Sequence, residues 1–189
     1  EFQENKSLKI LVQERIFEEL GANYTTYHPL DKFDVGFIVP TEDDNYFRHQ
    51  LLRGYVHDPG AAMQDGVGGH AGLFSNSNDI AKLMQMYLNG GLYGGKRFVQ
   101  ERTLIEFTSC QYCETDNRRG IGFDKPLVNE EGGPSCEQAS GSSYGHSGFT
   151  GTLTWADPEY DLIYVFLSNR IHPSAENNLL VKENIRTRI

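Results

Sequence analysis

The sequence predicts an α+β fold in which helices flank an antiparallel sheet. Two segments, residues 6–20 and a stretch that is capped by Ser75 or Ser77 and ends at Gly90, repeat apolar residues at the three- and four-residue steps of an amphipathic helix. Residues 150–156 alternate threonine with Gly, Leu and Trp, and six consecutive apolar residues follow at 162–167. A period of two is typical of a strand, and a short apolar run is typical of a strand inside a sheet.

The first third of the chain contains one clear helix and then loses its pattern. The apolar face of the helix at 6–20 is made of Leu8, Leu11, Val12, Ile16 and Leu20. Gly21 lies where a C-terminal cap belongs. Residues 24–59 are rich in Asp, Pro, His and aromatic residues, so we expect a long loop, with the acidic triplet 42–44 in a solvated turn. Four glycines within 66–72 predict a tight structural loop without the Lys of a phosphate-binding loop.

Shorter elements are expected in the remainder of the chain. The helix that ends at Gly90 carries on one face the apolar residues Ile80, Leu83, Met84, Tyr87 and Leu88. We expect a third helix at 102–109, a short strand at 121–123 and a weakly amphipathic helix at 175–188. A turn at 157–161 precedes the apolar run at 162–167, which predicts a central strand covered on both faces.

The length and the net charge of the chain limit the number of domains and the kinds of partner that it can have. A chain of 189 residues is expected to form one domain, residues 1–189. Its 17 Lys and Arg against 26 Asp and Glu give a net charge of −9, which argues against nucleic acid as a partner because phosphate binding needs a basic face. No run of 18 apolar residues is present. The polar start at Glu1 lacks both an initiator Met and a secretory signal, so we expect a piece of a longer protein.

The three cysteines do not complete a metal site. Cys110 and Cys113 form a Cys-x-x-Cys pair, and Cys136 lies beyond a loop rich in Gly and Glu. Zinc needs four ligands, so we expect incidental thiols or a local disulfide, and neither a metal nor another cofactor. Structural hydrogen bonds within loops are expected for three other polar residues: His57, Asp58 and His70.

A polar segment at 141–152 is the candidate for chemistry, and one interpretation of it is a nucleophile elbow. Residues 141–145 fit Gly-x-Ser-x-Gly around Ser143, followed by Asp157 or Asp161 and then His172 as the other members of a triad. That motif needs a strand before the serine and a helix after it, whereas here a polar loop precedes and a strand follows. The 29 residues from Ser143 to His172 are also too few for strand–helix units. We therefore favour a second interpretation.

The second interpretation starts from the segment Gly145-His146-Ser147-Gly148-Phe149-Thr150-Gly151-Thr152, which is followed by Trp155-x-Asp157-Pro158 and Ser168-Asn169-Arg170. In this order the segments resemble the last motif of the serine β-lactamase and penicillin-binding-protein superfamily, in particular its cephalosporinase-type and esterase-like branch. Further similar segments extend the resemblance over nearly the whole chain: 16–22, 57–59, 69–75 and 79–81. The resemblance implies a β-lactamase/transpeptidase-like fold that is incomplete, with residues 1–189 as the C-terminal portion of a single domain.

In that superfamily the last motif lies on an edge strand beside the nucleophile. By resemblance, His146 matches the cationic or donor position, Ser147 the hydroxyl that contacts substrate, and Gly148 the gap that admits it. The backbone N–H of Phe149 matches one of two oxyanion-hole donors, and Thr150 is a further substrate-binding position. His rather than Lys at 146 favours esterase- or peptidase-like chemistry over β-lactam hydrolysis.

The other two motifs of the superfamily are missing. Its nucleophile lies in Ser-x-x-Lys, and no serine of this sequence has Lys three residues later. The match of Tyr87-Leu88-Asn89 to Tyr-x-Asn lies on an apolar helix face and is expected to be core. We therefore expect an acyl-enzyme serine hydrolase in the parent protein and an inactive chain by itself. The alternative is a non-catalytic module that binds cell-wall or carbohydrate material.

The resemblance also implies partners and a location. The expected partners are the missing N-terminal half of the same domain and a small-molecule, peptide or ester substrate. Apolar surface that this half would cover is expected to favour self-association of the chain. Similar bacterial proteins are attached to secreted enzymes, which implies a periplasmic or extracellular location.

Overall fold

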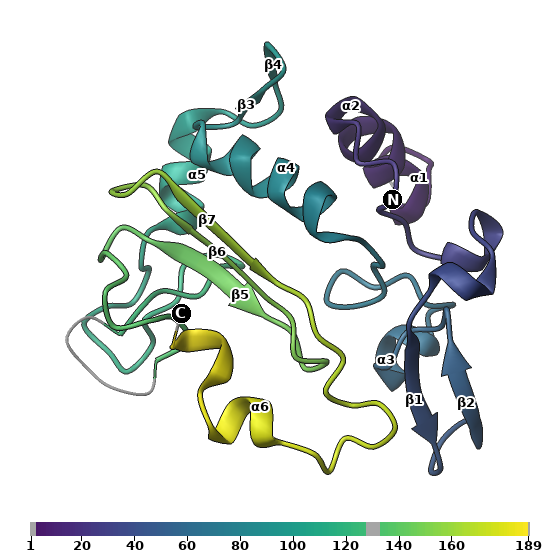
Figure 1. Ribbon diagram of the computed structural model, residues 1–189. Helices are drawn as coiled ribbons and strands as arrows, with labels where there is room; N and C mark the ends of the chain where they lie inside the picture. The colour runs from purple at the N-terminus through teal and green to yellow at the C-terminus, as the bar shows by residue number, and fades with distance from the viewer. Residues whose placement is uncertain (1–2, 128–132, 189) are drawn as a thin grey trace. The chain divides into compact units, whose positions relative to one another are not determined.

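The computed structural model describes residues 3–127 and 133–188 (Figure 1). It contains antiparallel sheets and helices, which confirms the predicted α+β class. The chain divides into two compact units, the first made of Glu1–Asp79 with Asn169–Asn178 and the second of Ile80–Ser168 with Leu179–Ile189. Within the described residues, no helix combines the length and the apolar character needed to cross a membrane.

The helix predicted at 6–20 is present in the first unit. It consists of α1 (Leu8–Val12), the π-helical turn η1 (Gln13–Phe17) and α2 (Glu18–Leu20). The Ser7 hydroxyl caps its start by accepting a hydrogen bond from the Ile10 N–H, and Gly21 ends it with a left-handed φ of 64°. Leu20 of the predicted face is buried and its other four residues are half-buried, while Phe17, which the prediction left out, is buried as well.

The prediction of a long loop at 24–59 is wrong in part, because this segment contains a hairpin. The ordered elements there are η2 (Pro29–Asp31), η3 (Val35–Phe37), β1 (Pro40–Asp44) and β2 (Gln50–Arg53). The two strands are antiparallel, with Glu42 opposite Leu52 and Asp44 opposite Gln50. The acidic sequence of β1 has no apolar alternation, so the usual strand signal is absent.

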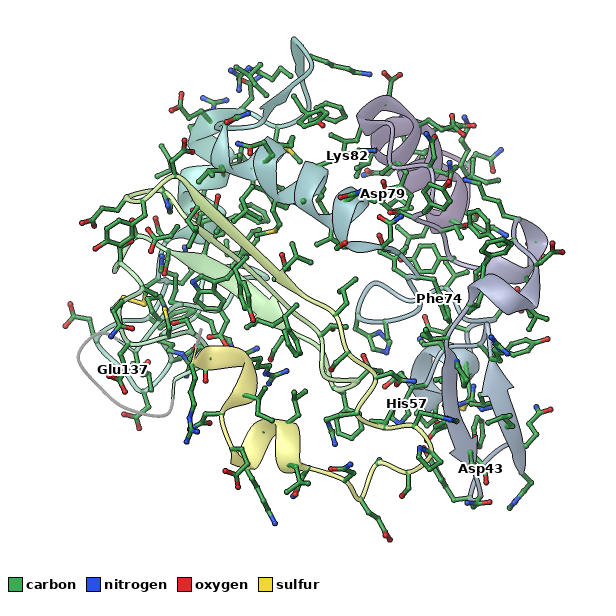
Figure 2. The ribbon with its side chains drawn as sticks, in the orientation of Figure 1. Asp43, His57, Phe74, Asp79, Lys82 and Glu137 are labelled. Atoms are coloured by element: carbon green, nitrogen blue, oxygen red, sulfur yellow. A yellow bond between two sulfur atoms is a disulfide. The ribbon has the colours of Figure 1, made fainter. Side chains whose placement is uncertain are left out.

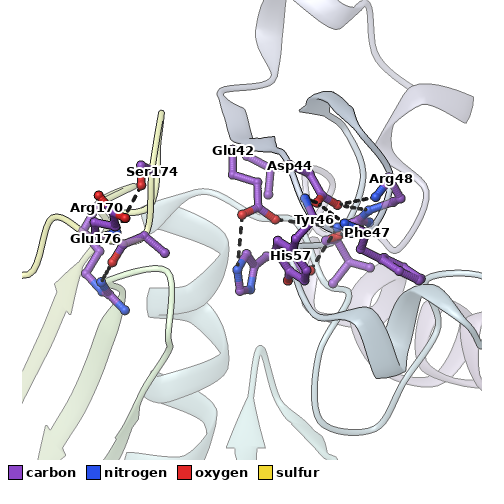
Figure 3. Close-up of polar contacts among 12 residues, drawn as sticks. Glu42, Asp44, Tyr46, Phe47, Arg48, His57, Arg170, Ser174 and Glu176 are labelled. Atoms are coloured by element: carbon purple, nitrogen blue, oxygen red, sulfur yellow. Dashed lines mark hydrogen bonds and ion pairs between the residues drawn. The ribbon is translucent and has the colours of Figure 1, made fainter.

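The acidic triplet 42–44 is not a solvated turn. Asp44 is fully buried and accepts hydrogen bonds from the backbone N–H groups of Tyr46, Phe47 and Arg48 at 2.9–3.2 Å (Figure 3). Arg48 Nε adds an ion pair of 2.9 Å. Burial alone would raise the pKa of Asp44, but these hydrogen bonds outweigh it and hold the pKa well below its usual range.

Glu42 is buried beside the same arginine. Its Oε2 lies 3.5 Å from His57 Nε2, and its Oε1 lies 3.7 Å from Arg48 Nη2 (Figure 3). Burial raises the pKa of Glu42, although the charges of His57 and Arg48 act in the opposite direction. The structure thus places His57 in the packing of the hairpin.

The Gly-rich segment is a tight structural loop, as expected. A Cβ on Gly72, which has a φ of 120°, would overlap the Gly66 carbonyl oxygen. Asp58 begins α3 (Pro59–Ala62) by accepting from the Ala61 N–H at 2.7 Å, and the His70 Nε2 lies 2.9 Å from the same carboxylate. Asp58 and His70 therefore make loop hydrogen bonds, as predicted.

The loop leads into α4 (Ser77–Leu88). Asp79 lies in the first turn of this helix (Figure 2). Its carboxylate accepts a hydrogen bond from the Tyr24 N–H at 2.6 Å. Just before the helix, Phe74 forms an isolated antiparallel bridge with Thr26 within the first unit.

The second unit is built on a three-stranded antiparallel sheet. Its order is β5 (Tyr144–Ser147), β6 (Leu153–Asp157), β7 (Leu162–Phe166). One face of the sheet meets α4, where Met84, Tyr144 and Ala156 form a buried cluster. Tyr87 packs against this cluster, which confirms that it is a core residue. Around it lie the hairpin β3 (Leu92–Tyr93) and β4 (Lys96–Arg97), and α5 (Glu101–Thr108), which matches the predicted third helix to within one residue.

Four expectations need correction in this unit and at the C-terminus. Strand β6 begins at Leu153, because residues 149–152 form the turn that precedes it. Strand β7 is at the edge of the described sheet, and its first residue, Leu162, is 55% exposed, so it is not covered on both faces. Residues 121–123 form no strand; only the next residue, Asp124, bridges to Gly145. The last helix is two short pieces, α6 (Leu179–Lys182) and η4 (Ile185–Thr187).

The expected local disulfide is present. Cys110 and Cys113 are bonded to each other, and Cys136 is a free thiol. Among the described residues no group of three His, Cys, Asp or Glu side chains is placed to hold a metal ion.

Gly145 is a sterically constrained position of the sheet. A Cβ there would overlap the Thr154 carbonyl oxygen and the Trp155 ring, neither of which can move without disrupting β6. We expect Gly145→Ala to lower the free energy of unfolding by about 3 kcal/mol, as overpacking does. Urea denaturation measures this, with Gly36→Ala as the control, because a Cβ on Gly36 meets nothing within 4 Å. Equal stability of the two variants would contradict the geometry.

Asp44 is expected to stabilise the first unit in a pH-dependent way. We expect Asp44→Asn to lower the free energy of unfolding by about 3 kcal/mol, because it removes the charged partner of the half-buried Arg48. The control, Asp43→Asn at the exposed neighbouring position, should change this free energy little. The folded-state pKa lies below the unfolded value, so this stabilisation is complete above the unfolded pKa of about 4 and is lost as the pH falls below it. Urea denaturation between pH 7 and pH 2 should show the two proteins converging in acid; a constant difference would contradict the assignment.

Candidate functional site

Strand β5 carries the first of the predicted site residues. It pairs with β6 so that His146 lies opposite Thr154, and the Gly148 N–H donates to the Thr152 carbonyl at 2.8 Å. In an antiparallel pair the direction of the backbone groups alternates, so those of Gly145 and Ser147 point to the outer edge of the strand. The strand therefore has one edge occupied by β6 and one edge directed away from it.

The outer edge is closed at one point. Gly145 exchanges two backbone hydrogen bonds with Asp124, at 2.7 and 3.1 Å. One step further along, at Ser147, no other strand of the described chain pairs with this edge. The part of the edge that is open to another strand thus begins at the predicted substrate-contacting serine, although a side chain, that of His146, contacts the Ser147 carbonyl oxygen.

His146 is exposed, and its ring has a defined orientation. Its Nδ1 lies 2.7 Å from the Ser147 carbonyl oxygen. A carbonyl only accepts, so Nδ1 carries the proton, and Nε2 of the neutral ring is an acceptor. A protonated ring would instead donate from both nitrogens. His146 can therefore hold or deliver a proton through Nε2 at the open end of the strand.

The remaining predicted residues form the turn after β5. The Gly151 N–H donates to the Gly148 carbonyl at 3.0 Å, so Phe149 and Thr150 are the two central residues of the turn. A Cβ on Gly148 would overlap Thr152 Oγ1, so a larger residue there would displace the Thr152 side chain. The structure thus brings His146, Ser147, Gly148, Phe149 and Thr150 together in one hairpin. It places Phe149 in the turn rather than in the strand, and the oxyanion role of its N–H stays a prediction.

The nucleophile-elbow interpretation is wrong. Ser143 is completely buried, and its hydroxyl accepts a hydrogen bond from Trp155 Nε1 at 3.0 Å. A strand rather than a helix follows it. Asp157 bonds to the N–H and the hydroxyl of Ser140, at 2.8 and 2.6 Å, and so has a structural role.

Sequence reasoning missed the residues that support the outer edge of β5. Arg118 pairs with the buried Asp124 carboxylate at 2.9 Å, and its Nε donates to the Lys125 carbonyl, also at 2.9 Å. This ion pair orients the residue that closes the edge at Gly145. No periodic pattern marks these positions, since they lie in a segment that forms turns and an isolated bridge.

Comparisons with known proteins identify the family. The family model described as Beta-lactamase matches residues 3–183. Proteins of Salmonella enteritidis PT4 and Salmonella agona, both named "Putative D-alanyl-D-alanine carboxypeptidase", are 37% identical to this chain over 182 residues. Each alignment covers 88% of this chain and 41% of the relative. The chain thus spans less than half the length of these curated relatives.

Solved structures share the fold at low sequence identity. Simvastatin synthase of Aspergillus terreus matches with a TM-score of 0.66 and 16% identity, covering 95% of this chain and 48% of that chain. A β-lactamase of Mycobacterium bovis gives 0.59 and 18%, covering 95% and 58%. A penicillin-binding-protein homologue of Caulobacter crescentus gives 0.58 and 18%, covering 88% and 47%. With a family match that extends over nearly the whole sequence, this chain belongs to the beta-lactamase family.

Proposed function

We propose that this chain is the C-terminal part of the catalytic domain of a serine hydrolase that works through an acyl-enzyme. The curated relatives are more than twice as long as the matched region, and no serine of this sequence lies in Ser-x-x-Lys. In this proposal the nucleophile and its activating lysine come from a preceding part of the protein. The open outer edge of β5 at Ser147 is the observation that carries it, because an extended substrate can lie along such an edge.

The hairpin residues take separate roles in this reaction. Gly148 keeps the edge free of a side chain, and the Ser147 hydroxyl contacts the substrate. His146 holds a proton at Nδ1 against the Ser147 carbonyl and accepts one at Nε2, which suits proton transfer to or from the leaving group. The Phe149 N–H supplies one oxyanion donor, and the nucleophilic serine supplies the other. Thr150, beside it in the turn, is a further substrate contact.

The substrate class follows from His146 and from the relatives. An imidazole that is neutral can act as a base, whereas a lysine ammonium mainly binds an anionic group. We therefore assign ester or peptide bonds rather than β-lactams as substrates. The relatives whose name specifies a D-alanyl-D-alanine carboxypeptidase support a peptide, and cell-wall peptides would place the protein in the periplasm or outside the cell.

The rest of the domain is the proposed partner of this chain. Strand β7 ends the described sheet and exposes Leu162, and Leu167 follows it at 44% exposure. These apolar side chains suit burial by further strands or helices of the same domain. Without that partner, the same surface would favour self-association.

The chain alone should not form an acyl-enzyme. We expect no stoichiometric adduct by mass spectrometry after incubation with a fluorescent penicillin or a p-nitrophenyl ester, because the Ser-x-x-Lys nucleophile is missing. The longer protein with Ser-x-x-Lys upstream should form the adduct under the same conditions. An adduct on the chain itself would overturn the assignment of the nucleophile, and no adduct on the longer protein would favour a non-catalytic binding module.

In the longer protein, His146→Ala should lower turnover of a p-nitrophenyl ester by roughly 10–10⁴-fold, the range for a positioned proton-transfer group. Its melting temperature should change little, because the side chain is exposed. His49→Ala, at an exposed position of the β1–β2 hairpin, is the control and should retain activity. Equal loss of activity in both variants, or loss of stability rather than rate at His146, would assign His146 a structural role.

A further inference from the structure

A cavity in the second unit lies apart from the His146 hairpin. It is an open pocket with a volume of about 370 Å³, lined by residues of α5 and the segment directly after it, by the segments around 125 and 141, and by one end of the β5–β6 pairing, near Tyr144 and Pro158. Tyr144 pairs with Ala156, two positions along the strand from the His146–Thr154 pair. The cavity and the open edge are therefore separate features of the same sheet.

Among the residues that the structure describes, Lys125 is the one charged residue that lines this cavity. It is only 8% exposed, which is unusual for a lysine. Its Nζ donates to the Ser142 carbonyl at 3.0 Å and lies 6.0 Å from the centre of the Tyr144 ring. No carboxylate of the described residues forms an ion pair with it. A buried ammonium with one neutral acceptor has two further N–H groups to satisfy.

Asp157, the carboxylate whose charge acts on Lys125, is already engaged. Asp157 accepts from the Ser140 N–H, the Ser140 hydroxyl and the Glu159 N–H. Burial lowers the pKa of Lys125, and the Asp157 charge opposes this only at a distance. A ligand carboxylate in the cavity would supply the compensation that the described protein groups do not.

The position of Lys125 is fixed before any ligand binds. Its N–H donates to Asp124 Oδ1 at 3.0 Å, and its carbonyl accepts from Arg118 Nε at 2.9 Å. Asp124 is itself held by Arg118 and by Gly145. The ammonium is thus presented from a rigid backbone, which reduces the entropy cost of binding.

The hydroxyl groups of two lining residues, Thr108 and Ser109, indicate which group the ligand carries beside its carboxylate. Thr108 Oγ1 donates to the Leu104 carbonyl at 2.8 Å, and Ser109 Oγ donates to the Ile105 carbonyl at 2.5 Å. Their protons are therefore used, so these oxygens can only accept from a ligand. The protein therefore offers one ammonium donor and additional acceptor oxygens. A ligand that has a carboxylate and a nearby N–H group matches this set, whereas a single cation is too little to balance the two charges of a phosphate dianion.

We propose that this cavity binds a small N-acylated amino acid, with its carboxylate on the Lys125 ammonium and its N–H toward the hydroxyl oxygens of Thr108 and Ser109. The apolar lining near Ile105, Tyr144 and Pro158 accommodates a compact acyl or side-chain group. This binding site does not depend on the hydrolase proposal, because neither His146 nor a nucleophile contributes to it.

Titration calorimetry of the chain at low salt tests the proposal with two probes, N-acetylglycine and its neutral amide. We expect saturable binding of N-acetylglycine at least about tenfold tighter than that of the amide, since a charge-assisted hydrogen bond is lost with the amide. This comparison uses the unaltered chain and so does not depend on a variant that folds. Equal binding of both probes, or no binding of either, would overturn the proposal.

A matched pair of variants tests whether Lys125 binds the ligand. Lys125→Met keeps the length of the side chain and should reduce N-acetylglycine binding to the level of the amide. Lys182→Met, at an exposed position of α6 in the same unit, should bind as the unaltered chain does. Residues 130 and 131 are glutamates outside the described residues. Binding that appears only when both are changed to Gln would show that the chain's own carboxylate takes this place, which would also overturn the proposal.

Discussion

The two backbone hydrogen bonds between Asp124 and Gly145 organise the second unit. They close the outer edge of β5 at one residue and leave it open from Ser147 onward. They also hold Asp124, the residue before Lys125, in place. The Asp124 carboxylate in turn binds Arg118 and the Lys125 N–H. One contact therefore sets the position both of the open edge and of the buried ammonium. A glycine is needed at 145 because the Trp155 ring and the Thr154 carbonyl occupy the space of a Cβ.

The sequence predicted correctly those helices in which regularly spaced apolar side chains form the buried face. The helix at 6–20 and α4 show apolar residues at helical spacing, and each packs through that face. Strand β1 could not be found in this way, because Glu42 and Asp44 are buried for electrostatic reasons. Arg48 and three backbone N–H groups compensate Asp44, and none of these contacts has a period along the sequence.

The candidate site was predictable to the extent that it is contiguous. His146 to Thr150 form a single hairpin, so a motif in the sequence remains together in space. The orientation of the His146 ring was not predictable, because it depends on the direction of the Ser147 carbonyl at the strand edge. The cavity at Lys125 was beyond sequence reasoning, since its lining comes from α5, from the segment after Asp124 and from two strand ends.

Charge compensation differs among three cations that are at least partly buried: Arg48, Arg118 and Lys125. Arg48 in the first unit faces the fully buried Asp44, and Arg118 in the second faces Asp124, so each guanidinium has a carboxylate within 2.9 Å. Lys125 is the one Lys or Arg that the described chain buries almost completely, yet its ammonium contacts only a carbonyl and an aromatic ring. In a chain with a net charge of −9, pairing this residue internally would be easy. In our proposal, an ammonium that lines a cavity to which the described residues bring no carboxylate is arranged to receive one from outside the protein.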